Sequence, residues 1–404
     1  MGCRDAACAF VPLRMLRRAV GEHDVLVEMK YCGVCHSDLH LAAGHLSAVA
    51  GKPKYPMVPG HELSGVCTQV GVGVTRIKVG DSVGIGCEPP ASCRMVDACL
   101  ECSECLSGHE QKCKKTSTST YGDSDKHGRA KLGSSQVATA GGYSSTFVVH
   151  ERFAVLIPAT YPLEMAGPVM CSGVTMYEPL KTFGCVDSPK RIGIVGLGGL
   201  GVMGVKIAKA LNCHVTCFSR TDAKKASALK MGADAFVATA NGAELLAVKG
   251  SLDLILNTIP ASHDSSVYTA LLAKGGRHVL LGLSSTGIAC LLGMQLTGGK
   301  SAEGFSMIGG IKNTEEVLAL CDKYKIYPEI EIRPVDDLNA IFELLDKSND
   351  TGLRYVLDIA GSLNEQTFDR PVAAAPSLKP GDEAGVSLSA VLYKLFTYNL
   401  WVRS

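Results

Sequence analysis

The sequence predicts an α/β protein with two domains, one rich in β-strands and one built on a doubly wound parallel sheet. Residues 25–83 alternate short apolar runs with Gly and Pro, which is typical of strands joined by turns. From residue 191 onwards, apolar runs alternate with stretches of helical periodicity, which is typical of βαβ units. With 404 residues, the chain is long enough for two buried cores.

The β-rich part contains runs such as Val25–Met29 and Ser64–Val70. Residues 87–142 then read as loop, and this loop carries four cysteines in a C-x2-C-x2-C-x7-C pattern: Cys99, Cys102, Cys105 and Cys113. Such spacing lets one short segment surround a single ion with four thiolates, the closed tetrahedral arrangement of a structural zinc. The alternative is chance clustering in a chain with 17 cysteines, which the regular spacing disfavours.

The second part begins with a short apolar strand, Arg191–Val195, followed by Gly196-Leu197-Gly198-Gly199-Leu200-Gly201 and a helical stretch from Val202 to Leu211. Further strands and helices are expected in alternation: strands at His214–Phe218, Leu252–Leu256 and His278–Leu283, and helices at Asp222–Met231, Ser265–Ala273 and Thr314–Tyr324. A mixed segment ends near Ile359. From about Ser362 the chain is rich in Pro, Ala, Ser and Gly, so we expect a disordered tail.

The glycine-rich segment has the context that a dinucleotide-binding loop requires, because it follows a strand and opens a helix. Gly196 allows a tight turn, Gly198 allows the backbone to approach a pyrophosphate, and Gly201 allows close packing of helix on strand. With Gly199 and Leu200, these residues open a helix whose N-terminus favours an anion. The alternative is a glycine-rich turn without a ligand.

The end of the second strand indicates which dinucleotide is bound. NAD-binding proteins usually place Asp or Glu there, to hold the ribose 2′-hydroxyl. Here Phe218 is followed by Ser219, Arg220 and Thr221, with Lys224 one turn later, so hydroxyl groups and cations are available for a 2′-phosphate. The sequence therefore favours NADP(H). Asp222 is near, but we interpret it as a cap of the helix that follows.

A second set of metal ligands is indicated by Cys35 and by His61-Glu62. Thiolate and imidazole are natural zinc ligands, and a distant cysteine could supply a third. A zinc with three protein ligands and one exchangeable position can bind and polarise a substrate oxygen. Taken singly, Cys35 would more often be a small buried apolar residue.

The segment Gly60-His61-Glu62-Leu63-Ser64-Gly65, with Gly71 and Val74, resembles the signature of zinc-containing medium-chain alcohol dehydrogenases. The resemblance is closest to the cinnamyl alcohol dehydrogenase branch and its NADP-dependent aldehyde reductases, and it covers about residues 20–360. Its other landmarks are residues 31–38, 141–144 and 306–310. It implies a GroES-like catalytic domain (1–171 and 310–361), an NADP-binding Rossmann domain (172–309), a remaining tail (362–404) and an active site in the cleft between the two domains.

The resemblance also implies roles for individual residues. Cys35, His61 and Cys171 would hold the catalytic zinc, Glu62 would approach the metal when its exchangeable ligand leaves, and Asp38 would orient His61. Ser37 would bond the substrate alcohol, and His40 would pass its proton to solvent through the cofactor ribose. Thr175, Thr258 and Ile308 would contact the cofactor.

The family chemistry interconverts primary alcohols and aldehydes. NADP(H) would favour aldehyde reduction in a cell, where that cofactor is usually kept reduced. The chain departs from the family pattern in a short N-terminus, in an extra segment at about 88–94, and at Thr116 and its neighbours, which lack a large aromatic residue. Met307 also stands where the plant enzymes often carry Phe. These departures favour a broad aldehyde range over a specialised cinnamyl substrate. The alternatives are an NAD-dependent polyol dehydrogenase of the same superfamily and a non-catalytic zinc-binding scaffold.

Charge and composition limit the partners. The chain has 40 Lys+Arg and 39 Asp+Glu without a long basic run, which argues against a nucleic acid or an anionic membrane. No stretch approaches the ~18 apolar residues of a membrane span. Cysteine usage and the absence of a secretory pattern favour the cytoplasm, although the N-terminal arginines leave a mitochondrial presequence open. The sequence leaves the oligomeric state open; the resemblance implies a dimer or a tetramer, of which we expect a homodimer.

Overall fold

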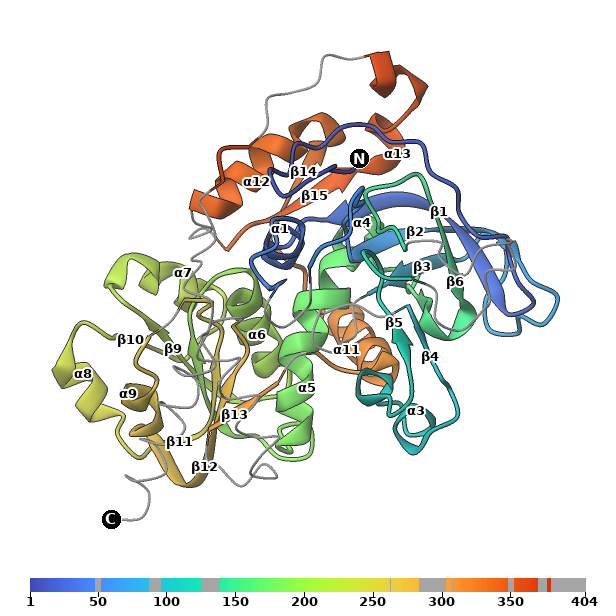
Figure 1. Cartoon of the computed structure of the whole chain (residues 1–404). Coiled ribbons are helices and arrows are strands. Elements are labelled where there is room, and N and C mark those ends of the chain that lie inside the picture. The colour runs from blue at the N-terminus through green and yellow to red at the C-terminus, as the bar shows by residue number, and fades with distance from the viewer. Residues whose placement is uncertain are drawn as a thin grey trace. The chain divides into compact units, whose positions relative to one another are not determined.

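The computed structural model describes residues 1–47, 52–86, 96–124, 139–261, 263–282, 303–306, 308–347, 352–369 and 376–378 (Figure 1). The chain forms two compact units. The first comprises Met1–Val174, Ile308–Asn349 and Leu353–Gly381, and the second comprises Thr175–Met307, Asp350–Gly352 and Asp382–Ser404. The predicted combination of a β-rich unit and a parallel-sheet unit is confirmed.

The first unit is organised around β1, which pairs with three other strands of a seven-stranded sheet. The sheet order is β14-β15-β1-β2-β3-β7, and β6 also pairs with β1. The strands are β1 (Asp24–Gly33), β2 (Glu62–Val70), β3 (Ser82–Ile85), β6 (Thr146–His150), β7 (Val155–Leu156), β14 (Ile330–Pro334) and β15 (Arg354–Asp358). All pairings are antiparallel except β14 with β15. Because β15 pairs with β1, the chain after residue 310 returns to complete this sheet.

Helices and short turns flank this sheet. They are α1 (His36–Ala42), α4 (Leu163–Pro168), η3 (Val169–Gly173), α11 (Ile311–Tyr324), α12 (Leu338–Lys347) and α13 (Ile359–Ser362), with the 3-10 turns η2 (Glu151–Phe153), η5 (Val335–Asp337) and η6 (Glu365–Asp369). The helix expected from Thr314 begins three residues earlier, because Gly310 takes the extended N-cap position and the buried Glu110 carboxylate accepts the backbone N–H of Ile311 at 3.2 Å.

A small lobe of the first unit carries the four spaced cysteines. It contains β4 (Asp97–Ala98), α3 (Ser103–Leu106), η1 (Glu110–Lys112) and β5 (Ser117–Thr118). β4 and β5 pair antiparallel, and this pairing closes the segment into a loop. The extra segment predicted at 88–94 lies outside the described residues.

The second unit is a six-stranded, fully parallel sheet in the order β10-β9-β8-β11-β12-β13. Its strands are β8 (Arg191–Val195), β9 (His214–Ser219), β10 (Ala235–Ala238), β11 (Leu252–Asn257), β12 (Leu272–Leu280) and β13 (Glu303–Phe305). The helices and helical turns are α5 (Val174–Thr182), α6 (Gly199–Ala210), η4 (Asp222–Lys224), α7 (Lys225–Lys230), α8 (Gly242–Ala247) and α9 (Ser266–Thr269). The strand order reverses around β8, as in a doubly wound sheet.

Two predicted boundaries of this unit are wrong. The helix expected over Ser265–Ala273 ends at Thr269, and the strand expected from His278 begins at Leu272. Both shifts have one cause, because Leu272 pairs with Leu252 of β11 and the carbonyl of Leu271 accepts the backbone N–H of Leu252. Sheet pairing therefore draws the end of the helical stretch into the strand.

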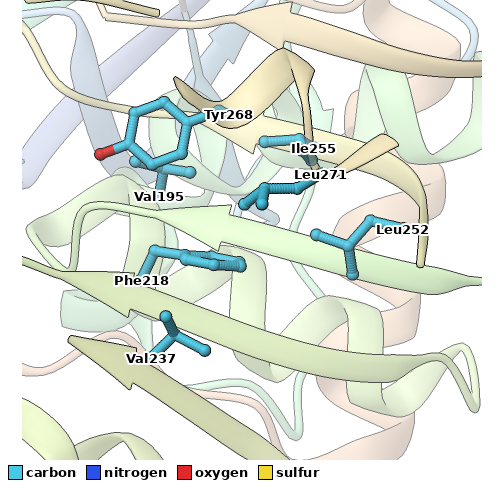
Figure 2. Close-up of a cluster of buried hydrophobic side chains, with 7 residues drawn as sticks. All are labelled: Val195, Phe218, Val237, Leu252, Ile255, Tyr268 and Leu271. Atoms are coloured by element: carbon cyan, nitrogen blue, oxygen red, sulfur yellow. The ribbon is translucent and has the colours of Figure 1, made fainter. Parts of the chain in front are cut away.

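Figure 2 shows the apolar core on one face of this sheet, where side chains from adjacent strands meet α9. Its buried members are Val195, Phe218, Val237, Leu252, Ile255, Tyr268 and Leu271. The core holds the strands in register, with Val195 opposite Phe218 on one side and opposite Asn257 on the other. Consequently the segments that follow β8, β9 and β11 leave the sheet at the same edge.

The segment after residue 361, expected to be a tail, begins with ordered structure. Ser362 ends α13, η6 follows, and Glu365 forms an ion pair with Arg14 at 2.6 Å between Oε2 and Nη2. Apart from 376–378, the later residues of this segment lie outside the described residues. The tail therefore stays a prediction for them.

Candidate functional site

Four buried side chains of the first unit bring their ligand atoms within 4.8 Å of one another: Cys35, His61, Glu62 and Cys171. Cys35 is the N-cap of α1, two residues after the end of β1. Gly33 of β1 pairs with Glu62 of β2, so Cys35 leaves its strand beside His61. The register of these two strands therefore assembles half of the cluster.

Glycines allow the close approaches in this cluster. A Cβ on Gly33 would lie 2.1 Å from Oε2 of Glu62, so a larger residue would push that carboxylate out of place. A Cβ on Gly167 of α4 would lie 2.4 Å from the carbonyl oxygen of Glu62. Because α4 packs this closely on β2, the helical turn η3 that follows it presents Cys171 to the cluster.

The polar atoms of the cluster fit a metal ion. His61 Nε2 and both carboxylate oxygens of Glu62 are buried and have no hydrogen-bond partner among the described residues. Burying such atoms without a partner is unfavourable, so this arrangement is expected where they coordinate a ligand. Two thiols, an imidazole nitrogen and a carboxylate are the donor set of zinc.

The Asp38 carboxylate fixes the orientation of the metal-facing imidazole. Asp38 is fully buried and accepts the Nδ1–H of His61 at 2.8 Å, so Nε2 is the nitrogen that can bind a metal when the ring is neutral. Two tyrosine hydroxyls also donate to it, Tyr121 at 2.5 Å and Tyr143 at 3.0 Å. The backbone N–H groups of Cys35 and Gly60 also donate to it.

Neither tyrosine, nor Arg354, was predicted as a site residue. Arg354 lies on β15, is 5% exposed, donates to the carbonyl of Val34 at 3.2 Å and lies 3.5 Å from Oε1 of Glu62. Tyr143 lies in the family landmark 141–144, but no pattern in the sequence marks Tyr121 or Arg354 as a site residue. The roles of all three become visible only when their buried partners, Asp38 and Glu62, are known.

Burial and neighbouring charges shift the acidities of this cluster. Burial acts to lower the pKa of His61, but the Asp38 carboxylate outweighs it and raises that pKa to about 10. Burial raises the pKa of Glu62 to about 7, although Arg354 opposes the shift. A hydrogen bond from Cys171 is the main cause that holds the pKa of Cys35 well below its usual range. These directions favour a thiolate at Cys35 even before a metal binds.

Ser37 and His40 lie three residues apart on α1 and therefore on one face of this helix. His40 Nδ1 lies 3.1 Å from Nδ1 of His45, so a single proton can be shared between the two rings. Burial, then the nearby His36 and His45, lower the pKa of His40 to about 4. His40 is therefore a neutral imidazole near pH 7. The sequence reasoning missed His45.

The four spaced cysteines form a second cluster within the lobe, and their sulfur atoms also lie within 4.8 Å of one another. Cys105 is buried and the other three are partly exposed. The sulfur of Cys105 lies 3.7 Å from that of Cys99 and 3.6 Å from that of Cys102. Backbone N–H groups of Lys114 and Cys105 lower the pKa of Cys102 to about 6. Four thiolates in a closed set fit a structural zinc.

The glycine loop of the second unit follows β8 and opens α6. Gly196 has φ 87°, a left-handed conformation that favours glycine. A Cβ on Gly201 would lie 2.0 Å from the carbonyl oxygen of Gly196, so only glycine fits where α6 packs on the loop. Gly198 is the extended N-cap of α6, and Gly199 and Leu200 form its first turn, with unpaired N–H groups for an anion.

Other predicted cofactor residues lie at the same edge of this sheet. Thr258 follows β11, and its hydroxyl donates to the carbonyl of Val195 at 2.9 Å. Ser219 ends β9; Arg220 and Thr221 follow it on the surface, and Lys224 Nζ donates to the carbonyl of Leu197 at 3.3 Å. The interpretation of Asp222 as a cap is wrong, because Thr221 takes the N-cap position of η4 and Asp222 lies 3.6 Å from Lys225.

Thr175 and Ile308 lie on other segments and are both buried, at 6% exposure each. Thr175 is the second residue of α5, and Ile308 lies three residues before α11. Met307 lies outside the described residues.

Comparisons with known proteins identify the families of the two domains. Residues 21–159 match the alcohol dehydrogenase GroES-like domain, and residues 199–323 match the zinc-binding dehydrogenase domain. A probable cinnamyl alcohol dehydrogenase of Saccharum officinarum is 40% identical over 91% of this chain and 95% of its own. Cinnamyl alcohol dehydrogenase 2 of Oryza sativa is 39% identical over 92% of this chain and 96% of its own.

Solved structures agree as well. A cinnamyl alcohol dehydrogenase from Sorghum bicolor has a TM-score of 0.77 at 35% identity, with 89% of this chain and 97% of that chain covered. The cinnamyl alcohol dehydrogenase from Helicobacter pylori, solved in complex with NADP(H), has a TM-score of 0.76 at 35% identity, with 90% of this chain and 98% of that chain covered.

The chain belongs to the zinc-binding alcohol dehydrogenase family, in its cinnamyl alcohol dehydrogenase branch. It is accordingly an oxidoreductase that interconverts alcohols and aldehydes, and the family and fold predictions are confirmed. Among the described residues, no helix is long and apolar enough to cross a membrane.

Proposed function

We propose that this chain is an NADP(H)-dependent alcohol dehydrogenase that works mainly as an aldehyde reductase with a broad substrate range. The observation that carries the proposal is the buried cluster of Cys35, His61 and Cys171, in which Nε2 of His61 has no hydrogen-bond partner within the described part of the chain. Zinc bound by these three residues would supply a Lewis acid that polarises an aldehyde carbonyl or lowers the pKa of an alcohol.

Residues around this cluster have proposed roles in binding and proton transfer. The Glu62 carboxylate is available as a temporary ligand when the exchangeable position empties, and Arg354 balances its charge. Ser37 bonds the substrate oxygen, and His40 takes up or releases its proton. The contact of His40 with His45 supports a further step towards solvent, because each ring can exchange one proton with the other.

The proposed cofactor site uses the glycine loop for the pyrophosphate. Arg220, Ser219, Thr221 and Lys224 are available for a 2′-phosphate, and no carboxylate ends β9. Thr258 supports the loop, while Thr175 and Ile308 are proposed contacts at the nicotinamide end. NADP(H) is further supported by the Helicobacter pylori relative, which was solved with that cofactor.

The second cysteine cluster is proposed to hold a structural zinc through Cys99, Cys102, Cys105 and Cys113. We further propose domain boundaries after residues 171, 309 and 361, a homodimer and a cytoplasmic location. The location is supported by cysteine usage, since all fourteen cysteines of the described part of the chain are free thiols.

The test is oxidation of NADPH with a panel of small aldehydes, run beside NADH and beside Cys35→Ser. Turnover with NADPH that vanishes in the variant would support both the zinc chemistry and the choice of cofactor. A preference for NADH would contradict the cofactor alone and favour a polyol dehydrogenase. The absence of turnover with both cofactors, in protein that holds only one zinc, would favour a non-catalytic zinc-binding scaffold.

A further inference from the structure

A chain of polar side chains lies at the carboxyl end of β11, outside the residues assigned above. Asn257 ends this strand and is 1% exposed. Its amide nitrogen lies 2.8 Å from Nε2 of His263 and 3.2 Å from Nε2 of His278, and its amide oxygen accepts the backbone N–H of Ile259 at 3.2 Å. One amide group therefore joins two imidazoles and the turn that follows the strand.

The orientation of the Asn257 amide is determined by the backbone. Ile259 N–H can only donate, so it must face Oδ1, and a flipped amide would set two donors against each other. The NH₂ group then faces both imidazoles, and each ring must accept at Nε2. For His263 this assignment is independently required, because Nδ1 lies 2.8 Å from the carbonyl of Ala261 and must donate to it.

The same amide fixes the position of Thr258. Its bond to Ile259 closes a turn around Thr258, of the kind that Asn side chains form with the backbone two residues on. The backbone N–H and the hydroxyl of Thr258 both donate to the carbonyl of Val195, each at 2.9 Å. That carbonyl belongs to the last residue of β8, directly before the left-handed Gly196, so the turn after β11 supports the start of the glycine loop.

Asn257 and His278 of the network are buried in the core of the same unit, and His263 is half-buried. The Tyr268 ring, labelled in Figure 2, lies edge-on to His263 and His278, with ring centroids 5.9 and 6.1 Å apart. His278 is fully buried on β12, and its Nδ1 lies 3.3 Å from the hydroxyl of Thr269. Since burial limits competition from water at Asn257, its bonds hold the turn in one arrangement.

We propose that Asn257 and His263 are positioning residues of the cofactor site, with His263 in its Nδ1–H form and the Asn257 amide holding Thr258 against the start of the glycine loop. The proposal rests on the proposed binding of NADP(H). It predicts that breaking the network weakens the dinucleotide without touching it, because the N–H groups of the loop lose their fixed alignment towards the pyrophosphate.

The first test compares two substitutions of His263 in the full, zinc-loaded chain. His263→Leu removes the acceptor for Asn257 and the donor for Ala261, whereas the amide of His263→Gln can replace both. We expect the NADPH dissociation constant to rise about fivefold to tenfold in His263→Leu, as expected for loss of one to two hydrogen bonds, and to recover largely in His263→Gln. In steady state the loss should appear in the KM for NADPH more than in kcat.

His214→Leu is the matched control, because His214 is an exposed histidine at the opposite, amino end of β9. It should leave the dissociation constant unchanged. An unchanged constant in folded His263→Leu would overturn the proposal, and so would equal weakening in both His263 variants.

The second test reads the tautomer directly and does not depend on the cofactor. Nitrogen NMR of the histidine side chains should show the chemical shift of an unprotonated, acceptor nitrogen at Nε2 of His263 in the wild-type chain. In Asn257→Asp, which lacks the amide N–H groups, this chemical shift should move to that of a protonated nitrogen. A protonated Nε2 in the wild type would contradict the network. If the wild type bound no NADPH while the tautomer was as expected, the proposed function would fail and the network would stand.

Discussion

At the scale of single residues, the chemistry of the candidate active site depends on how Asp38 is surrounded. Its carboxylate accepts from at least five donors, and one of them is the imidazole that faces the metal cluster. A carboxylate held this way both selects the tautomer of His61 and increases its strength as a ligand.

Replacing Asp38 should therefore weaken the metal centre. We expect Asp38→Asn to bind zinc at this cluster with an affinity about tenfold to a hundredfold lower, measured by titration with a chelator, and to lose activity in parallel. Tyr121→Phe is the control, since Asp38 then keeps its bonds to His61, Tyr143 and the backbone, and its effect should be clearly smaller. Equal zinc retention in Asp38→Asn and the wild type would contradict this role.

His45 should matter for proton transfer. In His45→Gln, we expect kcat at pH 7 to fall about tenfold, because an amide cannot take up and release a proton as an imidazole does. His109→Gln is a suitable control, because that histidine lies in the cysteine lobe beside Ser107. A solvent isotope effect that is the same in wild type and His45→Gln would argue against a proton step through this ring.

Arg220 is exposed at the end of β9 and has no carboxylate neighbour on that strand. Arg220→Ala should weaken NADPH by about tenfold or more while leaving NADH nearly unchanged, because only NADPH carries the 2′-phosphate that a guanidinium can bind. Dissociation constants for the two cofactors, measured by fluorescence, would decide this. A parallel loss for both would place the effect on loop structure instead.

At the scale of elements, the cysteine lobe has little apolar core and depends on its cluster. β4 and β5 contribute two residues each and α3 four, which is too little regular structure to be stable without a cross-link. Two ion pairs, Lys114–Glu104 and Lys115–Glu101, lie on the lobe surface, where such pairs contribute little.

Cys102→Ser should consequently reduce the zinc content from two ions per chain to one and open the lobe to proteolysis within residues 97–118. Leu106→Ala is the control, because Leu106 lies on the same helix and is 74% exposed. Measurement of zinc by atomic emission, followed by limited digestion, tests both effects. Retention of two zincs in Cys102→Ser would show that the cluster is not a metal site.

At the scale of the whole molecule, His40 links folding to pH. The folded state lowers its pKa to about 4, whereas an unfolded chain has a histidine pKa of about 6.5. Below about pH 6.5 the unfolded state therefore binds more protons, and the free energy of unfolding falls as the pH falls. At pH 5 this component amounts to roughly 2 kcal/mol.

We expect the melting temperature to fall more between pH 7 and pH 5 for the wild type than for His40→Gln, which lacks the titrating group. Thermal unfolding of both proteins, in the same buffers and with the same zinc content, tests this. Equal falls would show that His40 is accessible to protons in the folded state.

Much of this protein could be predicted from local sequence, for physical reasons that differ between the parts. The cysteine ladder and the glycine loop are encoded within short segments, since their spacing alone brings the ligand or backbone groups together. The parallel sheet follows from alternating periodicities. The boundary between α9 and β12 could not be predicted, because pairing of Leu252 with Leu272 overrides the helical pattern.

What the sequence determined by itself is therefore the family, the closed cysteine cluster and the dinucleotide loop, each of which depends on neighbours along the chain. Only the tertiary structure decided which distant groups meet. The strand register brings Cys35 beside His61, and Tyr121 and Tyr143 converge on Asp38. Arg354 returns on β15 to Glu62, and Asn257 meets His278 of β12. These contacts join residues that are far apart in the chain, so a local pattern cannot encode them, and burial makes each polar partner necessary.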